Sequence, residues 1–256
     1  AADEAATHPE GVVLVNAASP TAVAIGEYYR ARRGIPSDNL LRLDIPVQDP
    51  SLAGDESESI SRADYVRRVR DPVRAFLRAH ARRDAITTLV TTKGVPLHYT
   101  WSNHPMPRWL VESPNASIEA ELAILWSDRD GNAGIAGMAN PYFGSAQSFE
   151  EFRAGHHNGL LSYLTARLDG YAGNVDAASG VPADVKRLID AAQASGPRGK
   201  TLVDEDPGKA PGFLPANRLL LRPIVAMLRG MGLEVRHEAT TLFAGTGLGG
   251  AVMVNV

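Results

Sequence analysis

Gly11-Val-Val-Leu-Val-Asn16 is followed by Ser19-Pro-Thr-Ala22, and later by Gly34-Ile-Pro36 and Asn39-Leu-Leu-Arg-Leu-Asp44. The first run is continuously apolar, which is typical of a strand buried on both faces of a sheet. Ser19 suits a helix N-cap, the proline after it suits the first helical position, and Gly34 suits a helix end. The stretch therefore predicts strand, helix, turn and strand, the repeating unit of a parallel α/β sheet.

The rest of the chain continues this pattern. Residues 86–92 are rich in β-branched side chains and predict a third strand, and further strands are predicted over 160–168, 200–204, 233–237 and 250–256. Apolar residues at helical spacing over 61–80 supply the crossover that parallel strands need. We therefore expect an α/β fold in which a mainly parallel sheet lies between two layers of helices, as a three-layer sandwich.

Length and composition bound the organisation of the chain. It has 256 residues, of which 44% are hydrophobic and 21% are charged, and this suits one large α/β domain over 1–256. A stretch rich in Gly, Pro, Asn and His predicts an irregular lobe at 94–159. The chain ends on a strand pattern, where an α/β sheet would place a functional loop, so we expect truncation at the C-terminus.

Charge and cysteine content narrow the possible partners. The formal net charge of −3 makes nucleic acid a poor default partner, and the longest apolar runs are far too short for a membrane span. Cysteine is absent, which excludes disulfides and a cysteine nucleophile within these residues. The start, Ala1-Ala-Asp-Glu-Ala-Ala6, fits either signal-peptide cleavage or a shortened chain, and we favour an exported protein. The expected partner is an unknown protein or a small-molecule ligand.

Polar side chains recur where the predicted strands end, and that edge is where α/β sheets bind ligands. A lysine beside two threonines suits a carboxylate or phosphate, although the segment lacks the residue order of a P-loop. Each group also has a structural interpretation: a solvated lysine, an ion pair between loops, or an acidic turn. The ligand-binding candidates are Thr91, Thr92, Lys93, Arg167, Asp169, Asp204 and Asp206.

A weaker signal is Asp128-Arg-Asp-Gly-Asn132, which resembles part of a calcium-binding loop. Asp128, Asp130 and Asn132 are the candidate metal ligands. Position 139 is Ala, where such a loop supplies a bidentate Glu, and an ordinary Asp-Gly turn is the alternative. We predict no required cofactor, with calcium as a candidate metal at this loop.

Several runs taken together indicate a family. They are Val13-Leu-Val-Asn-Ala-Ala-Ser-Pro20, Ile25-Gly-Glu-Tyr-Tyr29, Arg33-Gly-Ile-Pro36, Thr92-Lys-Gly-Val-Pro-Leu97, Asn140-Pro-Tyr-Phe143 and Thr165-Ala-Arg-Leu-Asp-Gly170. The chain resembles, over essentially its whole length, an uncharacterised bacterial family of mostly exported proteins. It is also similar, more distantly, to the gingipain-type, caspase-like peptidase domain. This second resemblance implies a caspase/gingipain-like sheet.

In those peptidases a nucleophilic Cys and a general-base His lie on loops after successive core strands. In this chain the His loop would follow 251–256, but no His stands there and no Cys is present, so no catalytic residue is carried over. The resemblance therefore implies a non-catalytic or incomplete domain with a binding or scaffolding role. The alternative is a peptidase-like hydrolase with its site at the C-terminal edge of the sheet.

Overall fold

The computed structural model of the chain describes residues 7–46, 59–100, 115–127, 142, 145–155, 161–168, 175–195, 200–204, 222–230, 232–238 and 251–254. The chain divides into two compact units, Ala1–Asp190 and Ala191–Val256. The single domain predicted over the whole chain stays a prediction. Among the described residues, no helix has the length and apolar character needed to cross a membrane.

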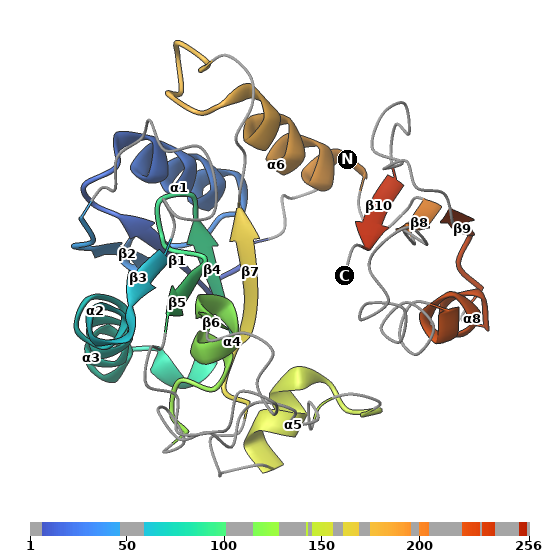
Figure 1. Cartoon of the computed structure of the whole chain (residues 1–256), viewed down its shortest axis with the longest axis horizontal. Helices are drawn as coiled ribbons and strands as arrows, with labels where there is room; N and C mark the ends of the chain where they lie inside the picture. Colours follow the sequence, from blue (N-terminus) through green and yellow to red (C-terminus); the bar gives the residue numbers. More distant parts are fainter. Residues whose placement is uncertain are drawn as a thin grey trace. The chain divides into compact units, whose positions relative to one another are not determined.

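The first unit is built on a four-stranded parallel sheet (Figure 1). Every pairing in this sheet is parallel, so the predicted α/β class with a mainly parallel sheet is confirmed. In spatial order the strands are β2 (Leu40–Leu43), β1 (Gly11–Asn16), β4 (Thr88–Thr92) and β7 (Leu164–Leu168). Along the chain, β2 is added on one side of β1 and β4 on the other, so the strand order reverses between β1 and β4.

Helices flank both faces of this sheet. Successive side chains of a strand point to opposite sides, so the apolar strands present a hydrophobic surface on each face for helices to cover. Val12 and Leu14 of β1 belong to the larger core. The helices over this core are α2 (Arg62–Tyr65), η3 (Val66–Arg70), α3 (Asp71–Ala79) and α4 (Ile118–Ala123), and those on the opposite face are α1 (Pro20–Arg32) and α6 (Ala183–Ser195). On that opposite face Val13 and Val15 pack with residues of α1, and Val90 of β4 packs with α1 and α6.

The helix α1 begins and ends where the sequence predicts. The Ser19 hydroxyl oxygen accepts the backbone N–H of Ala22 at 3.2 Å, and Pro20 takes the first helical position. Gly34 has φ +57°, a conformation that side chains with a Cβ rarely adopt, and it follows the last helical turn. Within the helix, a Cβ built on Gly26 would lie 2.3 Å from Cγ1 of Val15, so α1 approaches β1 as closely as only glycine allows.

Gly26→Ala is expected to lower the free energy of unfolding by about 1–3 kcal/mol, because the added methyl overlaps with Val15 and the helix or strand must shift. Helix propensity alone would act the other way, since Ala is favoured over Gly by about 1 kcal/mol. The sign of the change in urea denaturation is therefore diagnostic. Gly155→Ala is the matched control, because nothing lies within 4 Å of the added Cβ there. Unchanged or increased stability of Gly26→Ala would contradict the close approach.

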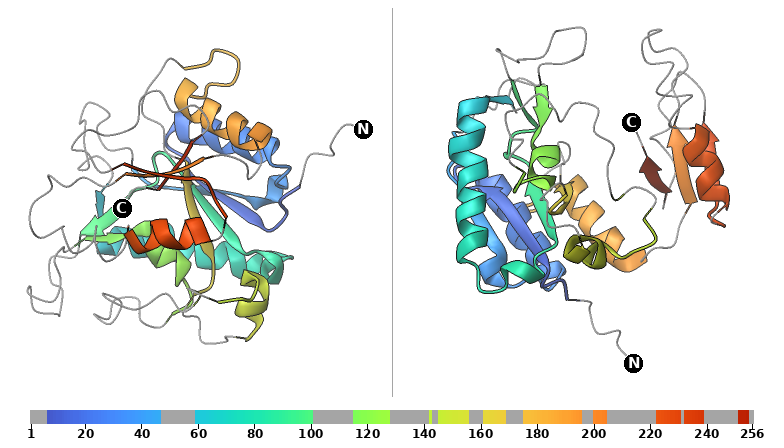
Figure 2. Two further views of the ribbon diagram at one scale, coloured as in Figure 1. Left: turned by 90° about the vertical axis from the view of Figure 1, so that its right-hand side faces the viewer. Right: turned by 90° about the horizontal axis from the view of Figure 1, so that it is seen from below.

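The predicted helix over 61–80 is confirmed as one continuous run of turns, α2–η3–α3 (Figure 2, right). The five residues of η3 form a wider π-helical turn within it. Tyr65, Val69, Val73 and Leu77 are its fully buried side chains, and they recur every fourth residue. This repeat holds one side of the run against the sheet and leaves the other side to polar residues.

A second, smaller sheet takes two of its three strands, β5 (His98–Thr100) and β6 (Asn115–Ser117), from the stretch predicted as an irregular lobe at 94–159. The other strand is β3 (Ser59–Ser61), with β3 parallel and β6 antiparallel to β5. The rings of Tyr65 and Tyr99 stack with centroids 4.9 Å apart and join this sheet to α2. The helix α5 (Phe149–Gly155) also falls in the predicted lobe, so its described part contains regular structure.

The second unit contains a three-stranded parallel sheet. The order is β10 (Ala251–Val254), β8 (Lys200–Asp204) and β9 (Val235–Glu238), so a strand is present at each of the three predicted C-terminal strand regions. The helix α8 (Arg222–Gly230) packs on it through Val225 against Val203.

Candidate functional site

The carboxyl edge of the four-stranded sheet brings together two of the predicted site residues. Thr91 of β4 and Arg167 of β7 are direct partners in the register of the parallel pair. Both side chains lie on the sheet face that α4 covers, where they meet Glu119 in the first turn of that helix. Three segments far apart in the sequence thus converge on one carboxylate.

Arg167 is the centre of this cluster. Its Nε and Nη2 approach Oε1 of Glu119 at 2.9 and 2.7 Å. Its Nη1 donates to the carbonyl oxygen of Val95 at 2.9 Å, and Nη2 also donates to that of Pro96 at 2.7 Å. The two charged side chains are only 12% and 19% exposed. The guanidinium therefore braces the loop after β4 against α4. Because both side chains are largely buried, loss of either would leave the other charge without a counter-ion.

Glu119 Oε1 accepts a third bond, from the Thr91 hydroxyl at 2.7 Å. Its other oxygen accepts the Ser117 hydroxyl at 3.2 Å, and Ser117 also caps α4 by accepting the backbone N–H of Ala120. Glu119 and Glu121 both lie in the first turn of α4. The sequence holds no signal that Glu119 meets an arginine 48 residues later, because that contact depends on the pairing of β4 with β7.

The other members of the predicted threonine–lysine group lie elsewhere. Thr92 points to the opposite face from Thr91, and its hydroxyl donates to the carbonyl oxygen of Leu14 at 3.3 Å. Lys93 is half-buried, and its backbone N–H donates to Leu168. Thr91 and Thr92 therefore cannot face one ligand from the same side of the sheet, because strand side chains alternate.

Parallel α/β sheets bind ligands at the carboxyl edge where the strand order reverses, which in this sheet is between β1 and β4. Here the chain makes hydrogen bonds to itself at that position. Asn16 donates from Nδ2 to the carbonyl oxygen of Gly94 at 3.0 Å, and its Oδ1 accepts the backbone N–H of Ala18. Gly94 has φ +91°, and a Cβ there would lie 3.3 Å from side-chain atoms of Ser19 and Ala22. This glycine lets the loop after β4 pack directly on the first turn of α1.

The remaining predicted site residues belong to the second unit or lie outside the described residues. Asp204 ends β8, which pairs with β9 and β10 in the sheet of the second unit. Among the described side chains, no group of three or more His, Asp or Glu residues is placed to hold a metal ion. The predicted residues that lie outside the described residues are Asp128, Asp130, Asn132, Asp169 and Asp206.

A second polar cluster lies beside the small sheet. Tyr99 is buried, and burial, followed by the negative charge of Glu121, raises its pKa to about 12. Its hydroxyl bonds to Glu121, which is itself only 6% exposed, while Arg62 acts in the opposite direction on the pKa. The phenol is therefore protonated at neutral pH, and it joins β5 to α4 without titrating.

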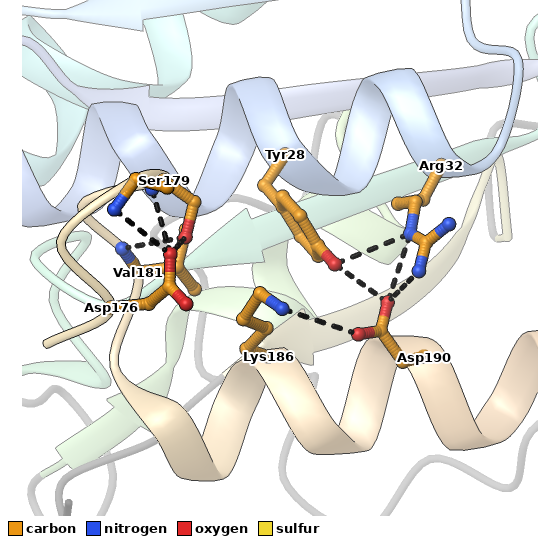
Figure 3. A network of polar contacts seen from close by, with 8 residues as sticks. Tyr28, Arg32, Asp176, Ser179, Val181, Lys186 and Asp190 are labelled. Carbon is orange, nitrogen blue, oxygen red and sulfur yellow. Dashed lines mark hydrogen bonds and ion pairs between the residues drawn. The ribbon is translucent and has the colours of Figure 1, made fainter. Parts of the chain in front are cut away.

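A third polar network joins α1 to α6 (Figure 3). Asp190 Oδ1 accepts the Tyr28 hydroxyl at 2.7 Å and Arg32 Nε and Nη2 at 2.9 and 2.6 Å, while Lys186 Nζ lies 3.7 Å from Oδ2. The Tyr28 hydrogen bond, followed by the bond and charge of Arg32, holds the pKa of Asp190 below its usual range. The network fixes the first half of α6 on α1.

Asp190→Asn is expected to lower stability at neutral pH and to have a diminishing effect in acid. The pKa of Asp190 is lower folded than unfolded, so its contribution is present above the unfolded value, about pH 4. It disappears as the pH falls through the folded value. Urea denaturation of both proteins from pH 7 to pH 2.5 measures this, with the exposed Asp84→Asn as control. A difference between wild type and Asp190→Asn that does not change with pH would contradict the assignment.

Comparison of the chain with protein-family models, curated proteins and solved structures gives no match.

Proposed function

We propose that this chain is a non-catalytic domain of the caspase/gingipain-like α/β class that acts by binding or scaffolding. The parallel order β2-β1-β4-β7 with helices on both faces is compatible with that class. The family resemblance of the sequence supports a bacterial, exported protein. Its partner is a protein or a small molecule that contacts the segment after β4, which Arg167 braces.

The observation that carries the proposal is that the predicted site residues at this edge bond to other groups of the chain. Arg167 binds Glu119 and two backbone carbonyls, Thr91 binds Glu119, and Thr92 binds a carbonyl of β1. A general acid, base or nucleophile must reach the reacting atom. These groups instead reach one another, and the result is a fixed loop at the edge where α/β domains recognise their ligands.

Turnover assays on the protein made from its complete gene test the non-catalytic part of the proposal. The substrates are labelled casein, peptidyl-aminomethylcoumarins with Arg, Lys or Asp before the scissile bond, and p-nitrophenyl acetate. We expect rates equal to those with heat-denatured protein, for wild type and for Thr91→Val alike. Turnover by wild type that Thr91→Val reduces would overturn the proposal in favour of the hydrolase with its site at this edge.

Binding is measured by immobilising the same protein and identifying what it retains from an envelope extract of its own cells. The matched variant is Arg167→Met, which removes the brace on the loop after β4, used at a temperature at which it is folded. We expect at least one molecule to be retained by wild type and lost from the variant. Identical retention by both would contradict recognition through this loop.

A further inference from the structure

Charge is strongly segregated along this chain. Residues 62–85 contain eight arginines and three aspartates and no lysine or glutamate, a formal charge of +5. The whole chain carries −3, so all the other residues together carry −8. A local excess of this size, opposite in sign to the rest of the molecule, indicates an electrostatic role in association.

The structure places this charge on one surface. Residues 62–79 are the run α2–η3–α3, whose apolar side chains face the sheet, and η4 (Arg83–Ala85) follows it. The exposed arginines lie off the buried side: Arg67 is 69% exposed, Arg82 43% and Arg83 60%, and Arg78 is also exposed. We call Arg67, Arg78, Arg82 and Arg83 the arginine face.

This arrangement opposes the stability of the helix itself. Arg70, Arg74 and Arg78 follow one another at four-residue spacing, and like charges at that spacing destabilise a helix by a few tenths of a kcal/mol per pair. Arg74 and Arg78 are partly accommodated over the ring of Trp126, at 5.8 and 5.0 Å. Arg70 lies 2.8 Å from Asp71, and Arg74 donates to the carbonyl oxygen of Leu125. Among the described contacts it is therefore Arg78, over the Trp126 ring, that can take a counter-charge from outside.

Among the described residues, the acidic partners of the arginine face are solvent-exposed. Arg67 pairs with Asp64 one helical turn away, and Arg83 lies 3.6 Å from Asp84, whose side chain is 96% exposed. Arg82 lies 3.9 Å from Asp38, which is 66% exposed. Exposed pairs of this kind contribute about 0.2–1 kcal/mol and are screened by salt, so a carboxylate on another molecule can compete for each arginine.

The aspartates that lie among the arginines favour an acidic polypeptide over a nucleic acid or an anionic membrane as the partner. Asp64 and Asp84 lie between or beside the arginines, so a uniform polyanion such as a nucleic acid or an anionic bilayer would bring negative charge against them. A polypeptide can place its carboxylates opposite the arginines alone, and this charge matching is what gives protein interfaces their specificity. We propose that the arginine face docks an acidic segment of a partner protein; the inference rests on the binding role proposed above.

The test uses a fluorescein-labelled decapeptide of alternating Glu and Gly as the probe, in fluorescence anisotropy at 50 mM salt. Arg78→Glu/Arg83→Glu removes two arginines of the face. Arg187→Glu/Arg222→Glu makes the same charge change at exposed positions elsewhere. We expect the first pair to weaken binding about tenfold or more, and the second by less than about twofold. We also expect the first pair alone to gain binding of the matching Lys-Gly peptide.

Three outcomes overturn the inference. They are no binding of the acidic peptide by wild type, equal loss in both double variants, and tighter binding of duplex DNA or phosphatidylglycerol vesicles than of the peptide. If Arg78→Glu/Arg83→Glu does not fold, Arg78→Gln/Arg83→Gln replaces it with the same expectation in direction. Failure here leaves the turnover result untouched, so it is distinguishable from failure of the proposed function.

Discussion

Arg167→Met is expected to lower the free energy of unfolding of the first unit by about 3–5 kcal/mol. The substitution leaves the Glu119 carboxylate largely buried with its cation gone, and breaking such a pair from one side costs about that much. It also strips two carbonyls, those of Val95 and Pro96, of their donors. Urea denaturation followed by circular dichroism measures the loss.

The control for this change is Arg229→Met. Arg229 is an exposed arginine with one 3.3 Å bond to the carbonyl of Val235, and its loss is expected to cost less than about 0.5 kcal/mol. Comparable effects at Arg167 and Arg229 would mean that the contacts at the carboxyl edge are not structural.

Asn39→Ala is expected to cost about 2–4 kcal/mol. Asn39 is fully buried at the start of β2, and its Nδ2 donates to the carbonyl oxygens of Pro9 and Gly11 at 2.9 and 2.7 Å. Its Oδ1 also accepts Nη2 of Arg82 at 3.4 Å. Alanine leaves both carbonyls without this donor, and each unsatisfied buried group costs about 1–3 kcal/mol.

The same denaturation experiment measures this loss, with the exposed Ser37→Ala as the neighbouring control. Hydrogen exchange adds a spatial readout, because the amides of β1 are expected to lose protection in Asn39→Ala. A variant as stable as Ser37→Ala would show that the amide does not hold the start of β1 to β2.

The architecture was predictable because its signals are local. The apolar run of β1, the Ser19–Pro20 start and Gly34 end of α1, and the four-residue repeat of α2–α3 each specify an element within a few residues. The strands β3, β5 and β6 were not predicted, since each has three residues and cannot establish an alternating pattern. Whether the fold is caspase/gingipain-like is a proposal, because strand order alone is shared by several α/β folds.

The candidate site was only partly predictable, for a different reason. Thr91 and Arg167 were identified as strand-end residues, and the register of β4 with β7 places them together. Glu119, which joins them, was not identified, because its role depends on how α4 packs across the sheet. Adjacency in the sequence groups Thr92 with Thr91, whereas the alternation of a strand places their side chains on opposite faces of the sheet.

The most direct test of the account is a double-mutant cycle of Arg167→Met and Glu119→Gln in urea denaturation. If the carboxyl edge is a structural brace, the two singles each destabilise strongly, and the double costs less than their sum by about 1.5–3 kcal/mol. That result would show that the charged residues at this edge stabilise the fold. Ligand recognition would then depend on the loop that they fix in place. A coupling below about 0.5 kcal/mol would contradict the account, since these charged groups would then be available for chemistry.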